Sequence, residues 1–165
     1  MGSKPASDDT VVIVLQLTAP RASKAPLGGK ALSKRWLFES SDPSIAREAR
    51  HELMRFIREH ASSSQDVFRT ELIIGELLAN AVGHAPGLVM IEIDWVGSEP
   101  LLTISDTGPG LTGFTPGLPG DQFTESGRGL FLVGNLANDV KIEPLTDRGT
   151  TIRVVLPVTR SEPST

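Results

Sequence analysis

Apolar residues recur at helical spacing in two stretches of the first half of the chain. The spacing of Ile45, Ala49, Leu53 and Phe56 predicts an amphipathic helix over 43–60. Its start is marked by Asp42, a good N-cap residue, and by Pro43, whose missing N–H costs nothing at the first helical position. After the serine-rich break at 62–64, a similar pattern predicts a second helix over about 66–84, with apolar positions at Val67, Leu72, Leu77 and Ala81.

Shorter runs of β-branched and aliphatic residues predict the strands. One strand is expected at 35–40, and runs at 88–96 and 101–105, separated by "GSEP", predict a hairpin. A helix is expected to resume near Gly129, followed by a short strand over 140–142 and a final alternating strand over 149–157. This order predicts an α+β fold, a two-layer α/β sandwich with helices on one face of a mostly antiparallel sheet.

The domain organisation follows from where these elements lie. With 165 residues, one domain is the expectation, and we predict it over 34–158. Residues 1–33 are expected to be an N-terminal tail or an added edge strand, because a short apolar run at 11–17 is surrounded by Pro, Ser, Lys and Gly. Residues 159–165 are expected to be a C-terminal tail.

Charge and composition narrow the class of protein. The net charge of −4 argues against a broad basic face for direct nucleic-acid or membrane-surface binding. No cysteine is present, which excludes disulfides and thiolate chemistry, and no apolar run approaches the roughly 20 residues that span a bilayer. A cytoplasmic enzyme or binding module fits these properties.

The stretch "ISDTGPGL", 104–111, raises the first functional question. An apolar strand ends in Asp106, and Gly108 and Gly110 follow, so a ligand could lie against the backbone beside a directional acceptor. A polar turn is the alternative, because Asp, Gly and Pro are common turn residues. More than half of positions 108–120 are Gly or Pro, which no helix interior tolerates, and a flexible lid over 111–126 is expected.

A second candidate site lies on the helix predicted over 66–84. Glu76 and Asn80 are one turn apart and project from the same face, and the small residues Gly75 and Ala79 leave room beside them. An Asn oxygen suits Mg²⁺, and the carboxylate could orient or deprotonate a nucleophile. The alternative is an exposed Glu with an Asn bonded to a neighbour.

Glycines also occur where a helix is expected to begin. A helix entered through Gly127, Arg128 and Gly129 would offer free N–H groups and a positive dipole end to a phosphate. Arg128 could steady a γ-phosphate or be an exposed lid charge. No Walker motif occurs, and the G-x-G-x-x-G at 108–113 is rejected because Pro116 and Pro119 forbid the helix that a dinucleotide site needs.

In order along the chain, "ELLANAVGHA", "DTGPG", "GRGLFLV" and "GTTIRVVLP" resemble the motifs of the histidine kinase-like ATPase superfamily, which has the Bergerat-type ATP-binding fold. From "RWLFESSDPSIAREAR" onward, over about 35–157, the chain resembles the bacterial anti-sigma factor serine/threonine kinases. The resemblance implies ATP and Mg²⁺ as cofactors. It implies an anti-sigma-factor antagonist and a sigma factor as partners, and a homodimer is a further option.

The resemblance also implies roles for individual residues. Asp106 would accept a hydrogen bond from the adenine amino group, and Thr150 would complete the adenine pocket. Asn80 would hold Mg²⁺, and Glu76 would be the catalytic base. Gly108 and Gly110 would let the nucleotide lie against the backbone; the residues expected at the phosphates are Gly127, Arg128, Gly129 and Leu130.

Three further residues could take part in function. His51 begins "HEL", as in the phosphoacceptor box of histidine kinases, but it lies too close to Glu76 within one domain, and a surface histidine is the better interpretation. His84 could be a helix-end contact or a ligand contact. Arg50 falls where the anti-sigma kinases carry a partner-binding arginine.

Three functions remain open. The first is a protein serine/threonine kinase that also binds a sigma factor. The second is a non-catalytic, nucleotide-gated binding module, and the third is a detached histidine-kinase ATPase domain. A binding module needs no base, so Glu76 favours catalysis, and the absence of a dimerisation helix pair disfavours the third.

Overall fold

The computed structural model describes residues 32–95, 97–110, 125–145 and 148–161, with the side chains of His84 and residues 125–127 outside the described set. The predicted lid, 111–126, therefore lies almost entirely outside the described residues, as does the run at 11–17. Of the helices that are described, none is long and apolar enough to cross a bilayer.

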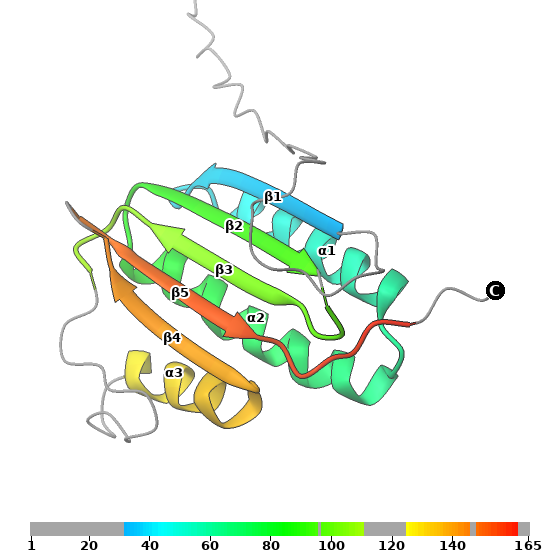
Figure 1. Cartoon of the computed structure of the whole chain (residues 1–165). Helices are drawn as coiled ribbons and strands as arrows, with labels where there is room; N and C mark the ends of the chain where they lie inside the picture. The colour runs from blue at the N-terminus through cyan, green and yellow to red at the C-terminus, as the bar shows by residue number, and fades with distance from the viewer. Residues whose placement is uncertain (1–31, 96, 111–124, 146–147, 162–165) are drawn as a thin grey trace, which may run out of the picture.

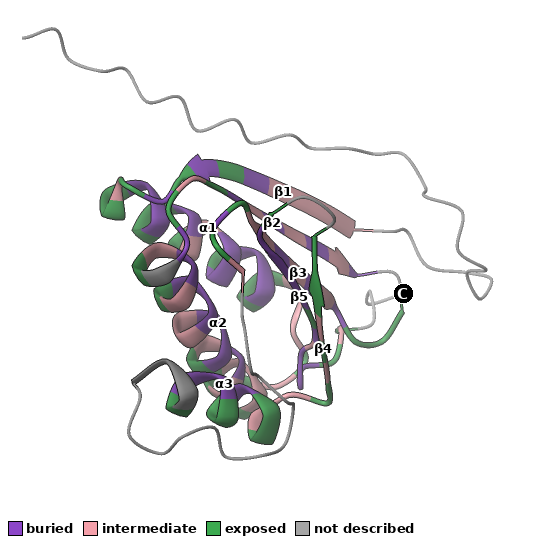
Figure 2. Cartoon of the chain, turned by 90° about the vertical axis from the view of Figure 1, so that its left-hand side faces the viewer, coloured by how far each residue is buried: buried purple, intermediate pink, exposed green. Residues whose placement is uncertain are grey.

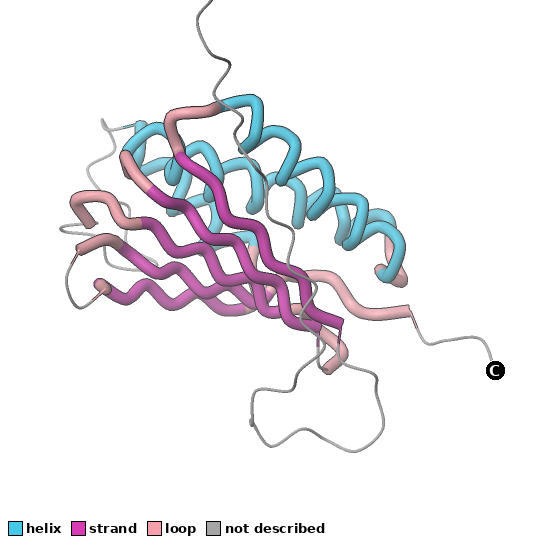
Figure 3. The backbone as a smooth tube through the Cα atoms, turned by 90° about the horizontal axis from the view of Figure 1, so that it is seen from above, coloured by secondary structure: helices cyan, strands magenta, loops and turns pink. Residues whose placement is uncertain are grey.

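Three helices pack on one face of a five-stranded sheet, which confirms the predicted α+β sandwich. The elements are β1 Leu32–Glu39, α1 Pro43–His60, α2 Ser64–His84, β2 Leu88–Trp95, β3 Leu101–Asp106, α3 Glu125–Leu136, β4 Asp139–Pro144 and β5 Thr150–Val155. All neighbouring strands are antiparallel, in the order β1-β2-β3-β5-β4. Seen from above, helices and strands form two separate layers (Figure 3).

The boundaries of α1 were predicted correctly, and the start shows why. The Asp42 side chain accepts a hydrogen bond from the Ser44 backbone N–H at 2.9 Å, and Pro43 occupies the first helical position. The hydrogen bond from the Ser44 hydroxyl, followed by the one from the Ser44 backbone, lowers the pKa of the Asp42 carboxyl. These two bonds fix the entry into α1.

Other boundaries differ from the predictions. β1 begins at Leu32 rather than at 35, because its backbone pairs with β2 over the whole length from Leu32–Trp95 to Glu39–Leu88. α2 begins at Ser64, two residues early, and α3 begins at Glu125 rather than near Gly129. β4 is longer than predicted, and β5 is shorter, covering Thr150–Val155.

The core lies between the two layers (Figure 2). Alternate residues of the strands face the helices, and each large buried aliphatic side chain contributes about 1.5–3 kcal/mol. Two tryptophans in this core keep their polar atoms bonded: Trp36 donates to Glu52 at 2.9 Å and Trp95 to the Ser98 carbonyl at 3.0 Å. The largest fully buried side chains are Trp36, Trp95, Leu53, Met54, Ile57, Ile73, Ile74, Leu77, Ile91, Ile93, Leu102 and Leu156.

Candidate nucleotide site

The predicted pair on α2 lies against α3. Glu76 and Asn80 are half-buried, and α2 presents its buried residues, among them Leu77 and Ala81, to the core. A Cβ on Gly129 would lie 2.5 Å from Glu76 Oε2 and 3.6 Å from Asn80 Nδ2. The backbone of α3 therefore leaves no room for a side chain beside the Glu76 carboxylate, and Asn80 lies close by.

Asn80 carries an unusual polar atom. Its Nδ2 is buried and has no hydrogen-bond partner among the described residues. An unpaired buried amide costs about 1–3 kcal/mol, so its retention is typical of a group whose partner is a ligand. A half-turn of the amide would present the carbonyl oxygen at the same position.

The start of α3 differs from the predicted phosphate loop. Because the helix begins at Glu125, Gly127 lies in its first turn, where N–H groups have no intrahelical acceptor, whereas Gly129 and Leu130 lie deeper in the helix. Leu130 is buried, so its side chain packs in the core. Arg128 is exposed and lines a surface depression together with Glu76.

The end of β3 is folded back onto the end of α2. Asp106 Oδ1 accepts a hydrogen bond from the Gly108 N–H at 2.9 Å, and a Cβ on Gly108 would lie 2.6 Å from the Ala85 Cα. Thr107 is bonded to Leu88 through both its backbone N–H and its hydroxyl. Because Ala85 directly follows α2, these contacts bring Asp106 to the helix end that carries Asn80.

Thr150 is the neighbour of Asp106 in the sheet. The two residues are Cα partners in the β3–β5 pairing, and Thr150 is buried. The predicted adenine acceptor and the predicted pocket residue are thus brought together. One residue further along the same two strands, Ser105 and Thr151 share a hydrogen bond of 2.9 Å between their hydroxyls.

Gly149 is a site residue that the sequence reasoning did not single out. Its φ of +103° is unfavourable for other residues, and a Cβ there would overlap the carbonyl oxygen of Asp106. Gly110, with φ of +88°, lies beside Gly149. A Cβ placed on Gly110 would be 3.6 Å from the Gly149 carbonyl oxygen. The signal was present in the sequence, because Gly149 begins the quoted run "GTTIRVVLP".

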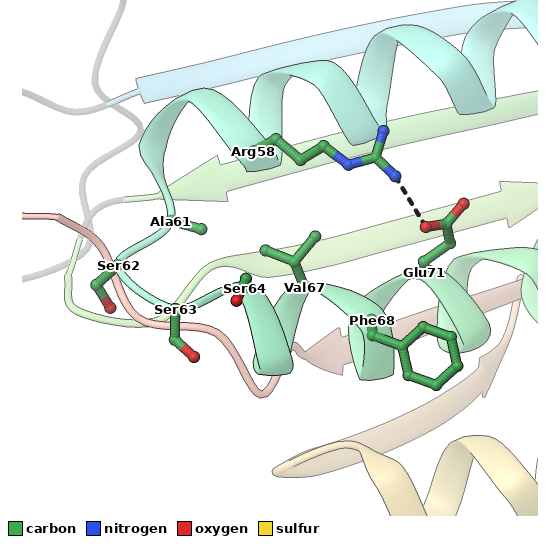
Figure 4. Close-up of a pocket in the computed structure, with 8 residues that line it drawn as sticks. All are labelled: Arg58, Ala61, Ser62, Ser63, Ser64, Val67, Phe68 and Glu71. Carbon is green, nitrogen blue, oxygen red and sulfur yellow. Dashed lines mark hydrogen bonds and ion pairs between the residues drawn. The ribbon is translucent and has the colours of Figure 1, made fainter.

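Arg50 lies on α1, at the surface where α1 meets α2. Its Nη2 is 3.4 Å from Glu71 Oε1, and Arg58 Nη2 is 2.8 Å from Glu71 Oε2; Figure 4 shows the second contact. The guanidinium of Arg50 lies over Gly75, within 3.9 Å of a Cβ placed there, and fills the room predicted beside that glycine. Its role in partner binding stays a prediction.

The histidines do not enlarge the site within the described residues. His51 is exposed on α1, and the side chain of His84 is outside the described set. Among the described residues, no group of three or more His, Asp and Glu side chains could hold a metal ion by itself. A single Asn ligand is nevertheless compatible with Mg²⁺, which usually takes one or two protein ligands together with phosphates and water.

Comparison with known protein families identifies a match over most of the chain. No curated protein is similar enough to this sequence to count as a match. A family model described as the histidine kinase-like ATPase domain matches residues 40–156, which span the structure from the end of β1 to just beyond β5. Asp106, Asn80, Gly129 and Thr150 all lie inside the matched region. The chain therefore belongs to the family of histidine kinase-like ATPase domains.

Proposed function

We propose that this ATP-binding domain is an anti-sigma factor serine/threonine kinase, which phosphorylates an anti-sigma-factor antagonist and binds a sigma factor. The observation that carries the proposal is the contact of Glu76 with Gly129, beside the unpaired amide of Asn80. A half-buried carboxylate held at the open side of a nucleotide site is what transfer to a hydroxyl requires.

The adenine is proposed to bind at the end of β3. The Asp106 carboxylate would accept a hydrogen bond from the adenine amino group, with Thr150 beside it on β5. Gly108 and Gly110 would let the nucleotide approach the backbone. The phosphates would lie toward Gly127, Arg128 and Gly129; Gly127 would offer a free N–H in the first turn of α3, and Arg128 a positive charge.

Asn80 is proposed to hold Mg²⁺ between the adenine end and Glu76. The metal would neutralise phosphate charge when bound, as it does in other phosphoryl transfers. The unpaired atom is the Nδ2 donor, so this role requires the amide to be turned by a half-turn, which places the Oδ1 acceptor at the unpaired position.

Glu76 is proposed to act on the acceptor hydroxyl. The oxygen of a serine or threonine attacks the γ-phosphorus, and the bond from that phosphorus to the β–γ bridging oxygen breaks. ADP leaves with that oxygen, and the hydroxyl proton passes to the Glu76 carboxylate. Positioned base catalysis of this kind contributes about 10²–10⁴ in rate.

Arg50 is proposed to contact the protein partner. Its ion pair with Glu71 is half exposed, so the pair contributes little to stability and both groups are accessible from solvent. The surface between α1 and α2 therefore offers a pair of charged groups to a partner, on a different side of α2 from the side that carries Glu76 and meets α3.

Two other functions make different predictions. A nucleotide-gated binding module would bind ATP and a partner without transfer. A detached histidine-kinase ATPase domain would transfer phosphate to a histidine of its partner. Glu76 argues against the first, because a binding module needs no base beside the γ-phosphate.

The stability of the product to acid separates these functions. The tagged chain is used to capture proteins from the native cell in ATP or ADP with Mg²⁺, and the captured proteins are then incubated with γ-labelled ATP. Acid-stable label on a small captured protein supports a serine/threonine kinase. Acid-labile label supports the histidine-kinase function, and a captured partner without label supports the binding module.

A further inference from the structure

The surface next to Glu76 is hollowed and carries two large apolar side chains beside charged ones. A depression of about 460 Å³ is lined by Glu76, Arg128, Gly129, Phe131 and Leu132. Phe131 is 42% exposed and Leu132 is 36% exposed, although both are large apolar side chains. Two adjacent apolar side chains in a hollow that also contains a carboxylate form a binding surface rather than a piece of the core.

The packing of α3 does not depend on these two residues. Leu130 and Val133 are its buried residues, and Leu136 packs against the core from the next turn. Phe131 and Leu132 are not among these core residues and remain partly exposed, so both can contact a second molecule.

Their place along α2 indicates what they face. α3 runs antiparallel to α2, because Gly129 touches Glu76 and Asn80, whereas the Leu136 carbonyl accepts a hydrogen bond of 3.5 Å from Arg69. Moving along α2 from the Asp106 end, one meets Asn80, then Glu76, and then the level of Phe131 and Leu132. The nucleotide is proposed to occupy the Asp106 side, so an acceptor hydroxyl reaches Glu76 from the Phe131 side.

We infer that Phe131 and Leu132 seat the protein substrate. The occupant is a segment of that protein in which the accepting serine or threonine is flanked by a large apolar side chain. That side chain packs on Phe131 and Leu132 while the hydroxyl lies at Glu76. The inference rests on the proposed kinase function and adds to it the residues that select the substrate.

An apolar residue remote from both proposed partner surfaces supplies the control. Leu37 on β1 is 39% exposed, close to the value for Phe131. Its strand neighbours Trp36 and Phe38 are buried against the helices, so Leu37 faces the opposite side of the sheet. A side chain seated there is remote from Glu76, which lies in the helical layer.

The test uses steady-state transfer from ATP to the purified partner that carries acid-stable label. Phe131→Ala and Leu132→Ala should each raise KM for that protein by about tenfold or more, as loss of a buried apolar anchor does, with kcat and ATP affinity within about threefold of the parent. Leu37→Ala should leave all three values near the parent's. Phe131→Leu, which keeps an apolar side chain, should retain most of the parent's affinity for the partner.

The outcomes separate this inference from the kinase function. If the parent transfers phosphate but Phe131→Ala and Leu132→Ala keep its KM, the substrate seat is wrong and the kinase function stands. An equal rise in KM for Leu37→Ala also overturns the assignment to α3. If ATP affinity falls in parallel with partner affinity, the two residues serve the nucleotide or the chain's own segment 111–124, and the inference is again wrong. If the parent labels no protein, both proposals fail.

Discussion

Gly129 on α3 and Glu76 on α2 are in such close contact that a methyl group on Gly129 would lie 2.5 Å from Glu76 Oε2. The carboxylate is thereby confined between two helices, beside the buried amide of Asn80. Because α3 also carries Gly127 in its first turn, the same helix meets the proposed phosphate position and the proposed base. The position of Glu76 therefore depends on how α3 is seated.

Gly129→Ala should displace the Glu76 carboxylate and slow phosphate transfer more than it weakens ATP binding. The contacted atom is the end of a flexible side chain that can swing aside, so stability should fall little, if at all, because alanine gains roughly 1 kcal/mol over glycine in a helix. Transfer rate, ATP affinity and melting temperature are measured together. Gly134→Ala on the same helix is the matched control, since nothing lies within 4 Å of its Cβ, and it should be as active as the parent. Unchanged transfer in Gly129→Ala would show that the base does not depend on this contact.

Gly149→Ala should be strongly destabilising. The substitution combines a φ of +103° with overlap of the Asp106 carbonyl oxygen, so β5 must shift away from β3. We expect a loss of about 2 kcal/mol or more, measured by chemical denaturation, together with weaker ATP binding. Gly83→Ala, which meets nothing within 4 Å near the end of α2, should be stable. Equal stability of the two variants would contradict the close approach of Gly149 to Asp106.

Asp106→Asn should weaken ATP binding while leaving the fold intact. The asparagine oxygen can still accept the bond from the Gly108 N–H, but its amide group mismatches the adenine amino group. A lost buried partner costs about 1–3 kcal/mol, roughly 5- to 150-fold in affinity. Calorimetric titration with ATP and Mg²⁺ gives the affinity, and the melting temperature controls for folding. An ATP affinity equal to that of the parent would favour the alternative interpretation, in which Asp106 is a polar turn residue.

The Asp42 cap should make stability depend on pH at the acid end. The hydrogen bonds from Ser44 lower the pKa of Asp42 in the folded protein. On acidification the unfolded chain therefore protonates this carboxylate at a higher pH than the folded protein does. Above the pKa of Asp42 in the unfolded chain, about 4, the stabilisation is fully present. It is lost as the pH falls from there through the lower pKa that Asp42 has in the folded protein. Asp42→Asn keeps a good cap residue that does not titrate. Thermal melts at pH 7 and pH 3 should therefore show a smaller acid loss in the variant, and identical losses would contradict the cap's charge dependence.

The sequence predicted best those elements whose signals are local. α1 was predicted to the residue, because Asp42 and Pro43 define its start and its apolar spacing is regular. The start of α3 was misjudged because Gly127 and Gly129 have poor helix propensity, yet packing against α2 at Gly129 admits no side chain and overrides that preference. β1 extends to Leu32 because of pairing with β2, which no single strand's pattern reveals.

The same difference between local sequence signals and long-range contacts applies to the site. Glu76 and Asn80 could be paired from their spacing alone, and Asp106 from the glycines that follow it. That Asp106 lies beside Thr150, and that Gly149 lies under its carbonyl, depends on the order of β3 and β5 in the sheet. Such contacts join residues far apart in sequence, so a sequence motif can suggest them but cannot supply the geometry.

Asn80→Ala should abolish the metal dependence of nucleotide binding. It removes the only amide proposed to hold Mg²⁺, while Asp106 and Thr150 remain at the adenine. ATP affinity with Mg²⁺ should fall to that measured with a chelator present, and transfer should be lost with it. Calorimetry in the presence and absence of Mg²⁺ gives the comparison. A variant whose ATP affinity still rises with Mg²⁺ would exclude Asn80 as the ligand.

The rate of phosphate transfer by Glu76→Gln tests the kinase account most directly. Glutamine keeps the shape of the side chain and its fit against Gly129 but removes its basicity. With labelled ATP and the captured partner, transfer should fall by about two orders of magnitude or more, while ATP affinity stays within a few fold. Transfer by Glu76→Gln at the rate of the parent would contradict the assignment of Glu76 as the catalytic base.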